Sequence, residues 1–177
     1  MQIVRKGKAW KFGDHIETEA IIPMSVIRAG ITDPQKLAEY CMAETYPEFH
    51  KNFTKGDLIV AGRNFGCGHG LHTAAYMAFK ALGVSAVIAE SIGRDFIRTA
   101  IDFGLPTITC KDVTKKVKQG DELEVNLGTG RIRNLTTGEM IDAEPLPPIL
   151  LERIEAGDLK AFLRKRLQTE AHLSHKS

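Results

Sequence analysis

Residues 58–70 read LIVAGRNFGCGHG, and this stretch of the 177-residue chain decides the fold. Residues 58–61 form a short apolar run, which is typical of a strand covered on both faces. The glycines that follow end this strand and lead into residues 71–82, whose apolar side chains recur at helical spacing up to Gly83. A strand that turns through glycines into a helix predicts one unit of a parallel α/β sheet.

The same unit repeats on the C-terminal side of this stretch. We expect a strand at residues 85–89, a helix from about 93 to 103 that ends at Gly104, and another strand at 105–109. Strands and helices that alternate at this spacing imply parallel crossovers.

The N-terminal side is less regular. Its pattern predicts a strand or hairpin at residues 2–12, a loop at 15–30, and a helix that begins near residue 32 and continues to Pro47.

Beyond Lys111 the sequence changes to short alternating strands separated by turn residues, which predicts β-hairpins and a second, smaller sheet. Residues 149–156 and 158–167 form two short helical segments. We therefore expect a single α/β domain with a parallel central sheet over residues 1–167, followed by a polar, frayed tail at 168–177.

The composition excludes several classes of protein. Apolar residues make up 43% of the chain, which is enough for a core and excludes a disordered or fibrous protein. Lys and Arg number 24 against 22 Asp and Glu, so the formal charge of +2 indicates neither a nucleic-acid partner nor an anionic membrane. No apolar run approaches the roughly 20 residues that a membrane span needs.

The cysteines indicate a reducing environment. Cys41, Cys67 and Cys110 are odd in number and contain no CxxC pair, which argues against a disulfide framework and against a zinc or iron–sulfur site built by this chain alone. We therefore expect a cytoplasmic protein.

The glycine-rich loop at residues 64–73 is the candidate ligand site. It places backbone N–H groups and the positive end of the following helix at the carboxyl edge of a parallel sheet, where carboxylates and phosphates bind. The dinucleotide pattern GxGxxG and the Gly-Lys-Ser/Thr of phosphate-binding loops are both absent from it. The glycines alone are also compatible with a tight turn that binds nothing.

Two histidines are the candidate reactive side chains of this loop. Cys67, His69 and His72 could ligate a metal, but three ligands so close in sequence rarely converge without a fourth from elsewhere. A histidine at a helix start is more readily a base or a donor near an anion, because the pKa of imidazole lies close to physiological pH. A capping or solvated side chain is the remaining alternative for His72.

These residues occur together in a known family. Nearly the whole chain resembles the small subunits of 3-isopropylmalate dehydratase, which are swivel domains of the aconitase family. The segments of this sequence that carry the resemblance are Lys11-Phe12-Gly13-Asp14, Ile21-Ile22-Pro23, Thr32-Asp33-Pro34, Pro47-Glu48-Phe49, Gly56-Asp57-Leu58-Ile59-Val60-Ala61-Gly62, Asn64-Phe65-Gly66-Cys67-Gly68, Gly104-Leu105-Pro106, Asn134-Leu135-Thr136-Thr137-Gly138 and Pro145-Leu146-Pro147.

The resemblance implies a swivelling three-layer β/β/α domain that works with a separate large subunit carrying a 4Fe-4S cluster. In this family a hydroxy di- or tricarboxylate is dehydrated and rehydrated, which moves its hydroxyl group to the neighbouring carbon, as in leucine biosynthesis. Iron acts as a Lewis acid on the hydroxyl and carboxylate, and the small subunit supplies the base that removes the carbon-bound proton. No cofactor is then expected on this chain alone.

The chain departs from the family pattern within the loop. The family follows its glycine with Ser-Ser-Arg-Glu-His, where the first serine is the base and the arginine binds a substrate carboxylate, whereas residues 69–73 here read HGLHT. The family's Asp-Thr-Asp is Glu17-Thr18-Glu19 in this chain, which keeps the charge and lengthens the side chains. Arg28 stands five residues after Pro23, where some relatives carry an arginine in their specificity loop.

Two hypotheses follow from these departures. In the first, His69 is the catalytic base of an active hydro-lyase, and Leu71 in place of the arginine favours a substrate with fewer charges or an apolar group. In the second, the chain is a catalytically idle swivel subunit that regulates or binds a ligand, and an unrelated small-molecule binding module is a third alternative. Under the first hypothesis the residues expected to bind the substrate are Arg28, Asn64, Gly68, Gly70 and His72.

Overall fold

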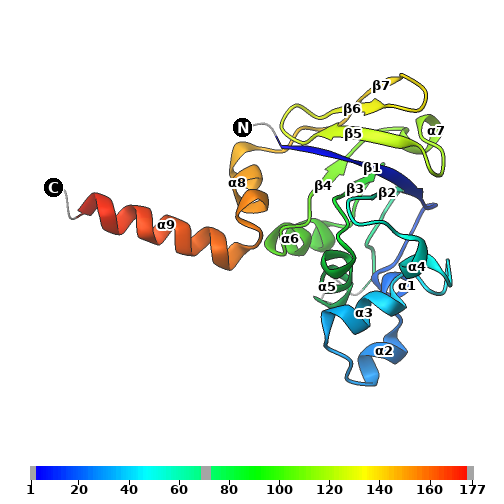
Figure 1. Cartoon of the computed structure of the whole chain (residues 1–177), viewed down its shortest axis with the longest axis horizontal. Coiled ribbons are helices and arrows are strands. Elements are labelled where there is room, and N and C mark those ends of the chain that lie inside the picture. Colours follow the sequence, from blue (N-terminus) through cyan, green and yellow to red (C-terminus); the bar gives the residue numbers. More distant parts are fainter. Residues whose placement is uncertain (1–2, 69–72, 175–177) are drawn as a thin grey trace.

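The computed structural model describes residues 3–68 and 73–174. Across these residues seven strands form one sheet in the order β4-β3-β2-β1-β5-β6-β7 (Figure 1). The strands are β1 (Val4–Lys11), β2 (Leu58–Ala61), β3 (Ala86–Ala89), β4 (Thr107–Thr109), β5 (Glu122–Asn126), β6 (Arg131–Asn134) and β7 (Met140–Asp142). The helices are α1 (Thr18–Ile21), α2 (Met24–Arg28), α3 (Pro34–Tyr40), α4 (Phe49–Asn52), α5 (Thr73–Leu82), α6 (Arg94–Asp102), α7 (Val113–Lys116), α8 (Pro148–Ala156) and α9 (Leu159–Ser174).

The sheet has a parallel half and an antiparallel half that share β1. Strands β1 to β4 run parallel, with Ala9 of β1 opposite Leu58 of β2 and Leu58 opposite Ala86 of β3. The first part of β1 pairs antiparallel with β5, and β6 and β7 extend that half. The expected central sheet and smaller second sheet are therefore two parts of one mixed sheet.

The parallel strands are buried on both faces, as predicted for residues 58–61. In β2, Ile59 and Ala61 belong to one apolar cluster, while Leu58 and Val60 belong to another, because successive side chains of a strand point to opposite faces. Helices α3, α5 and α6 cover the first cluster. The antiparallel strands with α7 and α8 cover the second. These layers confirm the expected β/β/α architecture.

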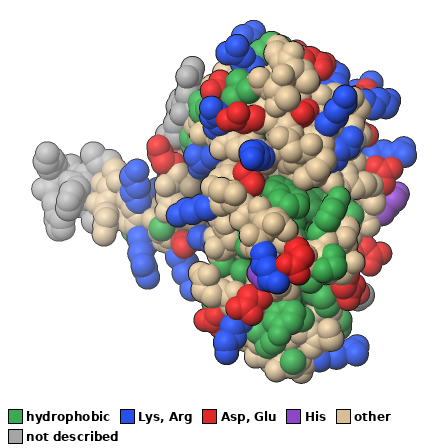
Figure 2. All heavy atoms as spheres, turned by 45° about the vertical axis from the view of Figure 1, so that its right-hand side comes forward, with side chains coloured by type: hydrophobic (Ala, Val, Ile, Leu, Met, Phe, Trp, Pro, Cys, Tyr) green, Lys and Arg blue, Asp and Glu red, His purple; other side chains and the backbone are tan. Residues whose placement is uncertain are grey.

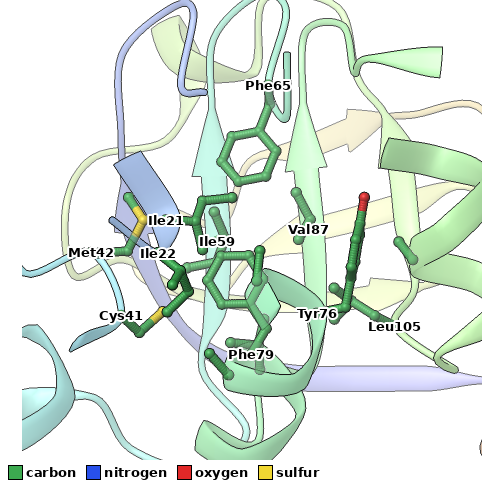
Figure 3. Packing of buried hydrophobic residues seen from close by; sticks show 14 of the residues in the cluster. Ile21, Ile22, Cys41, Met42, Ile59, Phe65, Tyr76, Phe79, Val87 and Leu105 are labelled. Carbon is green, nitrogen blue, oxygen red and sulfur yellow. The ribbon is translucent and has the colours of Figure 1, made fainter. Parts of the chain in front are cut away.

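The helix-side core packs α5 against the middle of the sheet. Figure 3 shows Tyr76 and Phe79 of α5 beside Ile59 of β2 and Val87 of β3, and all four side chains are fully buried. The helix predicted at residues 71–82 is therefore confirmed from Thr73 onward, and β3, α6 and β4 lie within two residues of their predicted bounds.

The helix predicted to continue to Pro47 ends earlier, at Tyr40. Cys41 is extended, and the next residue, Met42, has a φ of 55°, which a helix does not allow. Both side chains are fully buried beside Ile21, whose carbonyl accepts a hydrogen bond from the Met42 N–H at 2.9 Å (Figure 3). Tertiary packing therefore ends α3, although the local sequence favours its continuation.

The strand or hairpin predicted at residues 2–12 is confirmed as a strand, β1. Other elements differ from the predictions. The loop predicted at 15–30 contains the short helices α1 and α2. At the C-terminal end, α9 continues through residues 168–174, which were expected to be a frayed tail. No described helix has the length and apolar character that a membrane span requires.

Candidate functional site

The loop that leaves the carboxyl end of β2 is held on both sides by backbone hydrogen bonds. On one side, Gly66 donates to the carbonyl of Ile16 at 2.7 Å, and the Cys67 carbonyl accepts from Thr18 at 2.9 Å. On the other side, Phe65 donates to Ser91 at 3.0 Å and its carbonyl accepts from Gly93 at 2.7 Å. Residues 65–67 therefore form a fixed platform that ends just before residues 69–72.

Glycine is required at one position of this platform and at the residue that follows it. Gly66 is buried with a φ of 72°, and a Cβ there would lie 2.3 Å from the ring of Phe96 in α6. Gly68 has a φ of 94°, although a Cβ there would meet only ordinary contacts with Glu17 and Thr18. The glycines thus allow a left-handed backbone and a close approach to α6.

The predicted base and two predicted binding residues lie outside the described residues. His69, Gly70 and His72 fall within residues 69–72, so their roles stay predictions. Gly68 is the last described residue before them, and Thr73, the first residue of α5, is the next one after them.

Asn64 contacts a neighbouring histidine. Its backbone N–H donates to the hydroxyl of Ser91 at 2.8 Å, and its Nδ2 lies 3.2 Å from Nδ1 of His15. Asn64 and His15 both have positive φ values, of 60° and 56°. Asn64 is exposed, so its side chain is accessible to a ligand while its backbone is fixed.

Arg28 lies at the C-terminal end of α2 and is exposed. The residue before it, Ile27, lines a small cavity of about 180 Å³ together with Thr73 and Ala74 from the first turn of α5. The remaining lining residues of this cavity, here called the side pocket, are Ile31, Thr32, Leu37 and Met77. Arg28 is thus next in sequence to an apolar pocket that borders the start of α5.

The sequence of residues 58–70 does not by itself predict the side pocket. Its walls come from α2, α3 and α5, which are far apart in the sequence, so the pocket depends on how these helices pack. The available signal was the apolar residues Ile27 and Ile31 on either side of Arg28, in a segment expected to be a loop.

A second feature that the sequence analysis missed is a polar cleft at the carboxyl ends of the parallel strands. Its volume is about 590 Å³, and its walls include Arg63 after β2, Glu90 after β3 and Lys111 after β4. Arg63 also forms an ion pair with Asp14 at 3.2 Å, and the hydrogen bonds from Arg63 hold the pKa of that carboxyl below its ordinary value. Open α/β sheets bind ligands at this edge.

Glu17 and Glu19 lie beside the platform. They line a cavity of about 450 Å³ together with Glu44, and the backbone of Glu17 pairs with that of Cys67. Burial raises the pKa of the Cys67 thiol, and the nearby charge of Glu17 raises it further. Cys67 is therefore held as a neutral thiol, which disfavours both metal ligation and nucleophilic reactivity.

The described cysteines do not fit an iron–sulfur cluster. Cys41 belongs to the helix-side core and Cys110 to the core on the opposite face of the sheet, while Cys67 lies in the loop. Over residues 3–68 and 73–174, no group of three or more His, Cys, Asp or Glu side chains could hold a metal ion.

Comparisons with known proteins agree on one family. Residues 16–113 match the family described as the aconitase C-terminal domain. The isopropylmalate/citramalate isomerase small subunit of Methanocaldococcus jannaschii is 46% identical over 94% of this chain and 98% of its own length. The 3-isopropylmalate dehydratase small subunit of Thermodesulfovibrio yellowstonii is 42% identical over 93% of this chain and 96% of its own.

A solved structure extends the likeness to three dimensions. The crystal structure of a 3-isopropylmalate dehydratase chain from Methanocaldococcus jannaschii matches with a TM-score of 0.88 at 39% identity. The match covers 96% of this chain and 99% of the other. The fold therefore corresponds over almost the whole length of both chains.

Proposed function

The chain belongs to the family of 3-isopropylmalate dehydratase small subunits, and we propose that its loop at residues 64–73 supplies the base and part of the carboxylate-binding surface of a two-subunit hydro-lyase. The chain is the small subunit of a hydro-lyase. Its relatives are named small subunits, which implies a large catalytic subunit as partner. The described cysteines do not fit a cluster, so we assign the 4Fe-4S cluster to that large subunit.

The observation that carries the proposal is the fixed platform at the carboxyl end of β2. It holds the chain rigidly on both sides up to Gly68, and α5 begins at Thr73. Four residues, His69 among them, connect these two ends. His69 follows the fixed platform by two residues in the sequence, which supports a role for it in acid–base catalysis.

His69 is the proposed base. In dehydration it takes the proton from the carbon next to the hydroxyl-bearing carbon as the C–O bond breaks, and the hydroxyl leaves as hydroxide, which the Lewis acid assigned to the large subunit would accept and which becomes water with a proton from solvent. In rehydration these transfers reverse, and His69 returns the proton to carbon. The N–H groups at the start of α5 and the Arg28 guanidinium favour a carboxylate nearby, because both are positive. Gly68, Gly70, Asn64 and His72 are the further residues proposed to bind the substrate.

The side pocket supports a substrate with a small apolar substituent. Ile27, Ile31 and Ala74 line it, and Leu71 replaces the arginine with which the family binds a carboxylate. A substrate that carries a branched alkyl group on a hydroxy dicarboxylate could bury that group there, with its carboxylate toward Arg28. Isopropylmalate itself is the first member of this class to test.

The proposal is tested with the assembled enzyme. The chain is purified anaerobically with its large subunit, and hydration is measured on a panel of unsaturated dicarboxylates for the wild type, for His69→Ala and for His72→Ala. We expect kcat to fall about 10²–10⁴-fold in His69→Ala, which is the usual contribution of a general base. His72→Ala should change KM more than kcat.

The assay also separates the alternatives. Turnover that is unchanged in His69→Ala excludes the histidine base. A stable complex that turns over none of the acids favours the idle, regulatory subunit, in which the loss of the family's serine and arginine has removed catalysis.

A further inference from the structure

The side chains of His15 and Asn64 meet beside the platform. His15 follows β1 and Asn64 follows β2, and Nδ2 of Asn64 lies 3.2 Å from Nδ1 of His15. Both residues are exposed, and the platform begins at the residue after Asn64. Asn64 is proposed to bind the substrate, whereas the mechanism above gives His15 no role. The contact therefore brings an unused imidazole to the edge of the candidate site.

The backbone of both residues is held in a conformation that residues other than glycine rarely adopt. The φ of His15 is 56° and that of Asn64 is 60°, both in the left-handed region. Three backbone N–H groups hold it in place: His15 donates to the carbonyl of Arg63 at 2.7 Å, Arg63 to the carboxylate of Asp14 at 2.7 Å, and Asn64 to the hydroxyl of Ser91 at 2.8 Å. Such conformations persist where surrounding contacts enforce them, and they are frequent at ligand sites.

The contact fixes which ring nitrogen of His15 carries the proton. An amide nitrogen only donates hydrogen bonds, so Nδ2 of Asn64 donates and Nδ1 of His15 accepts. The neutral imidazole then carries its proton on Nε2, which becomes a donor. Among the described residues, the ring of His15 has no second hydrogen-bond partner. Its Nε2–H is therefore available to a ligand.

The two carboxylates that lie close to His15 in the sequence have other surroundings. Asp14 is compensated by Arg63, whose guanidinium forms an ion pair with it at 3.2 Å. Glu17 lines the cavity that it shares with Glu44. Over the face shown in Figure 2, basic and acidic side chains are interspersed, so a broad charged patch does not mark a site there. Recognition of an anion beside His15 therefore depends on individual N–H donors.

The proposed substrate has groups that need such a donor. A carboxylate has about four lone-pair sites and accepts several hydrogen bonds at once. The arginine that binds a carboxylate in the family is Leu71 in this chain, so two of the expected donors are missing. Asp14, Arg63 and Ser91, which surround the pair, also line the polar cleft at the carboxyl ends of the parallel strands, where open α/β sheets bind ligands.

From these observations we propose that His15 binds a carboxylate of the substrate through Nε2–H, and that Asn64 is a positioning residue that holds the imidazole ring for this contact. The proposal rests on the proposed function, because it requires that the loop at residues 64–73 binds a hydroxy dicarboxylate. It adds a residue from the loop after β1 to the substrate-binding set.

The experiment uses steady-state kinetics of the enzyme assembled with its large subunit, on an acid that the wild type turns over. His15→Asn keeps an acceptor at the position of Nδ1 but has no group at that of Nε2, whereas His15→Gln extends an amide N–H donor toward the position of Nε2. Asn64→Ala removes the positioning side chain. Asn52→Ala is its matched control, because Asn52 is also exposed and its Nδ2 donates within α4, to the carbonyl of Glu48 at 3.0 Å.

Circular dichroism, thermal unfolding and co-purification with the large subunit verify that each variant folds and assembles. We expect KM to rise about tenfold in His15→Asn and in Asn64→Ala, with a smaller change in kcat, because a hydrogen bond to a charged group is lost. His15→Gln should recover most of this loss, and Asn52→Ala should match the wild type.

A KM that rises in His15→Gln but not in His15→Asn would overturn the proposal, because His15 would then only support Asn64. An equal KM in the two His15 variants, raised or unchanged, would overturn it as well, since the donor would have no effect. In these cases turnover by the wild type leaves the proposed function standing. Loss of large-subunit binding in His15→Asn would assign His15 to the subunit interface instead, and a wild type that turns over none of the acids would reject the proposed function and this proposal together.

Discussion

Gly66 lies so close to the ring of Phe96 that no side chain fits between them: a Cβ at Gly66 would lie 2.3 Å from Cδ2 of Phe96. Phe96 is fully buried and packs edge-on against Phe65, with ring centres 5.2 Å apart. The loop of the candidate site is therefore packed directly on the first turn of α6. Its position depends on the core as well as on its own hydrogen bonds.

Replacing Gly66 with alanine should destabilise the fold strongly. The new Cβ would clash with Phe96, and the positive φ of 72° would also be unfavourable for alanine. Together we expect a loss of about 2–5 kcal/mol in the free energy of unfolding. Urea denaturation of the isolated chain measures it.

The control for Gly66→Ala is Gly138→Ala. Gly138 also has a positive φ, of 81°, but no atom lies within 4 Å of a Cβ built there. It should therefore lose only the backbone contribution of about 1–2 kcal/mol. Equal losses in the two variants would show that the contact with Phe96 costs nothing and that the loop can move away from α6.

The part of the fold that could be predicted is the part that local patterns specify. Residues 58–61, the glycines after them and the apolar spacing of 71–82 predict a strand, a turn and a helix without reference to the rest of the chain. The parallel order followed from the repetition of this unit. The strand at 58–61 and the helix from Thr73 onward are confirmed: the strand is buried on both faces and the helix along one stripe.

The features that could not be predicted depend on contacts between distant residues. The side pocket exists only because α2 and α3 pack beside the first turn of α5. The end of α3 is set by the burial of Met42 against Ile21. The polar composition of residues 168–174 indicated a frayed tail, but α9 continues through them. Polarity alone does not show whether a helix continues from a well-anchored first turn.

The side chain of Asp57 links β1, the strand that both halves of the sheet share, to the start of β2. Its buried carboxylate, 5% exposed, accepts hydrogen bonds from the N–H of Lys8 at 3.0 Å, from Nε1 of Trp10 at 3.0 Å and from the N–H of Thr54 at 3.1 Å. Asp57→Ala leaves these three donors without an acceptor, so we expect a loss of about 2–4 kcal/mol in the free energy of unfolding. Chemical denaturation measures it.

Two further variants test whether the stability lost in Asp57→Ala comes from leaving three partly buried N–H donors without an acceptor. Asp57→Asn keeps one acceptor oxygen and should lose less than the alanine variant. Asp33→Ala removes an exposed carboxylate that accepts one hydrogen bond, from Lys36 at 2.9 Å at the start of α3, and should cost only about 1 kcal/mol. If Asp57→Ala costs no more than Asp33→Ala, the buried donors find other acceptors.

The thiol of Cys67 should react slowly at neutral pH. Burial and the charge of Glu17 raise its pKa, so the reactive thiolate becomes abundant only at a higher pH than for a free cysteine. Glu17→Gln removes the smaller of these two causes, so the pKa should fall but stay above its ordinary value. Alkylation rates against pH, followed by peptide mass spectrometry, measure the midpoint for this cysteine.

The other two cysteines are internal controls in the same alkylation experiment. Burial raises the pKa of Cys110 to about 11 and that of the fully buried Cys41 as well, and neither should respond to Glu17→Gln. Glu44→Gln alters another carboxylate of the same cavity and should leave the Cys67 midpoint unchanged. A midpoint for Cys67 below that of a free cysteine would contradict the prediction and reopen a role as a nucleophile or metal ligand.

Arg28 should contribute to substrate binding in the assembled enzyme. It is exposed at the end of α2, so Arg28→Ala should leave stability unchanged. If Arg28 binds a substrate carboxylate, its loss removes about 1.5–3 kcal/mol, and KM should rise roughly 10- to 100-fold. Lys51→Ala, which removes an exposed cation paired with Glu48, is the control, and steady-state kinetics with the large subunit compare the two.

From the side pocket we predict a preference among substrates that does not follow from Arg28 alone. Ala74→Leu adds three carbons to the pocket wall, where a branched alkyl substituent of the substrate is proposed to lie. Binding of such an acid should weaken by about 1.5–3 kcal/mol, while an unsubstituted dicarboxylate should bind as before. The ratio of kcat/KM for the two acids should therefore fall at least tenfold in Ala74→Leu and stay constant in Ala156→Leu, an alanine that does not line the pocket. A ratio that is unchanged in both variants would place the alkyl group elsewhere, and Arg28 would then act on a substrate whose specificity the large subunit determines.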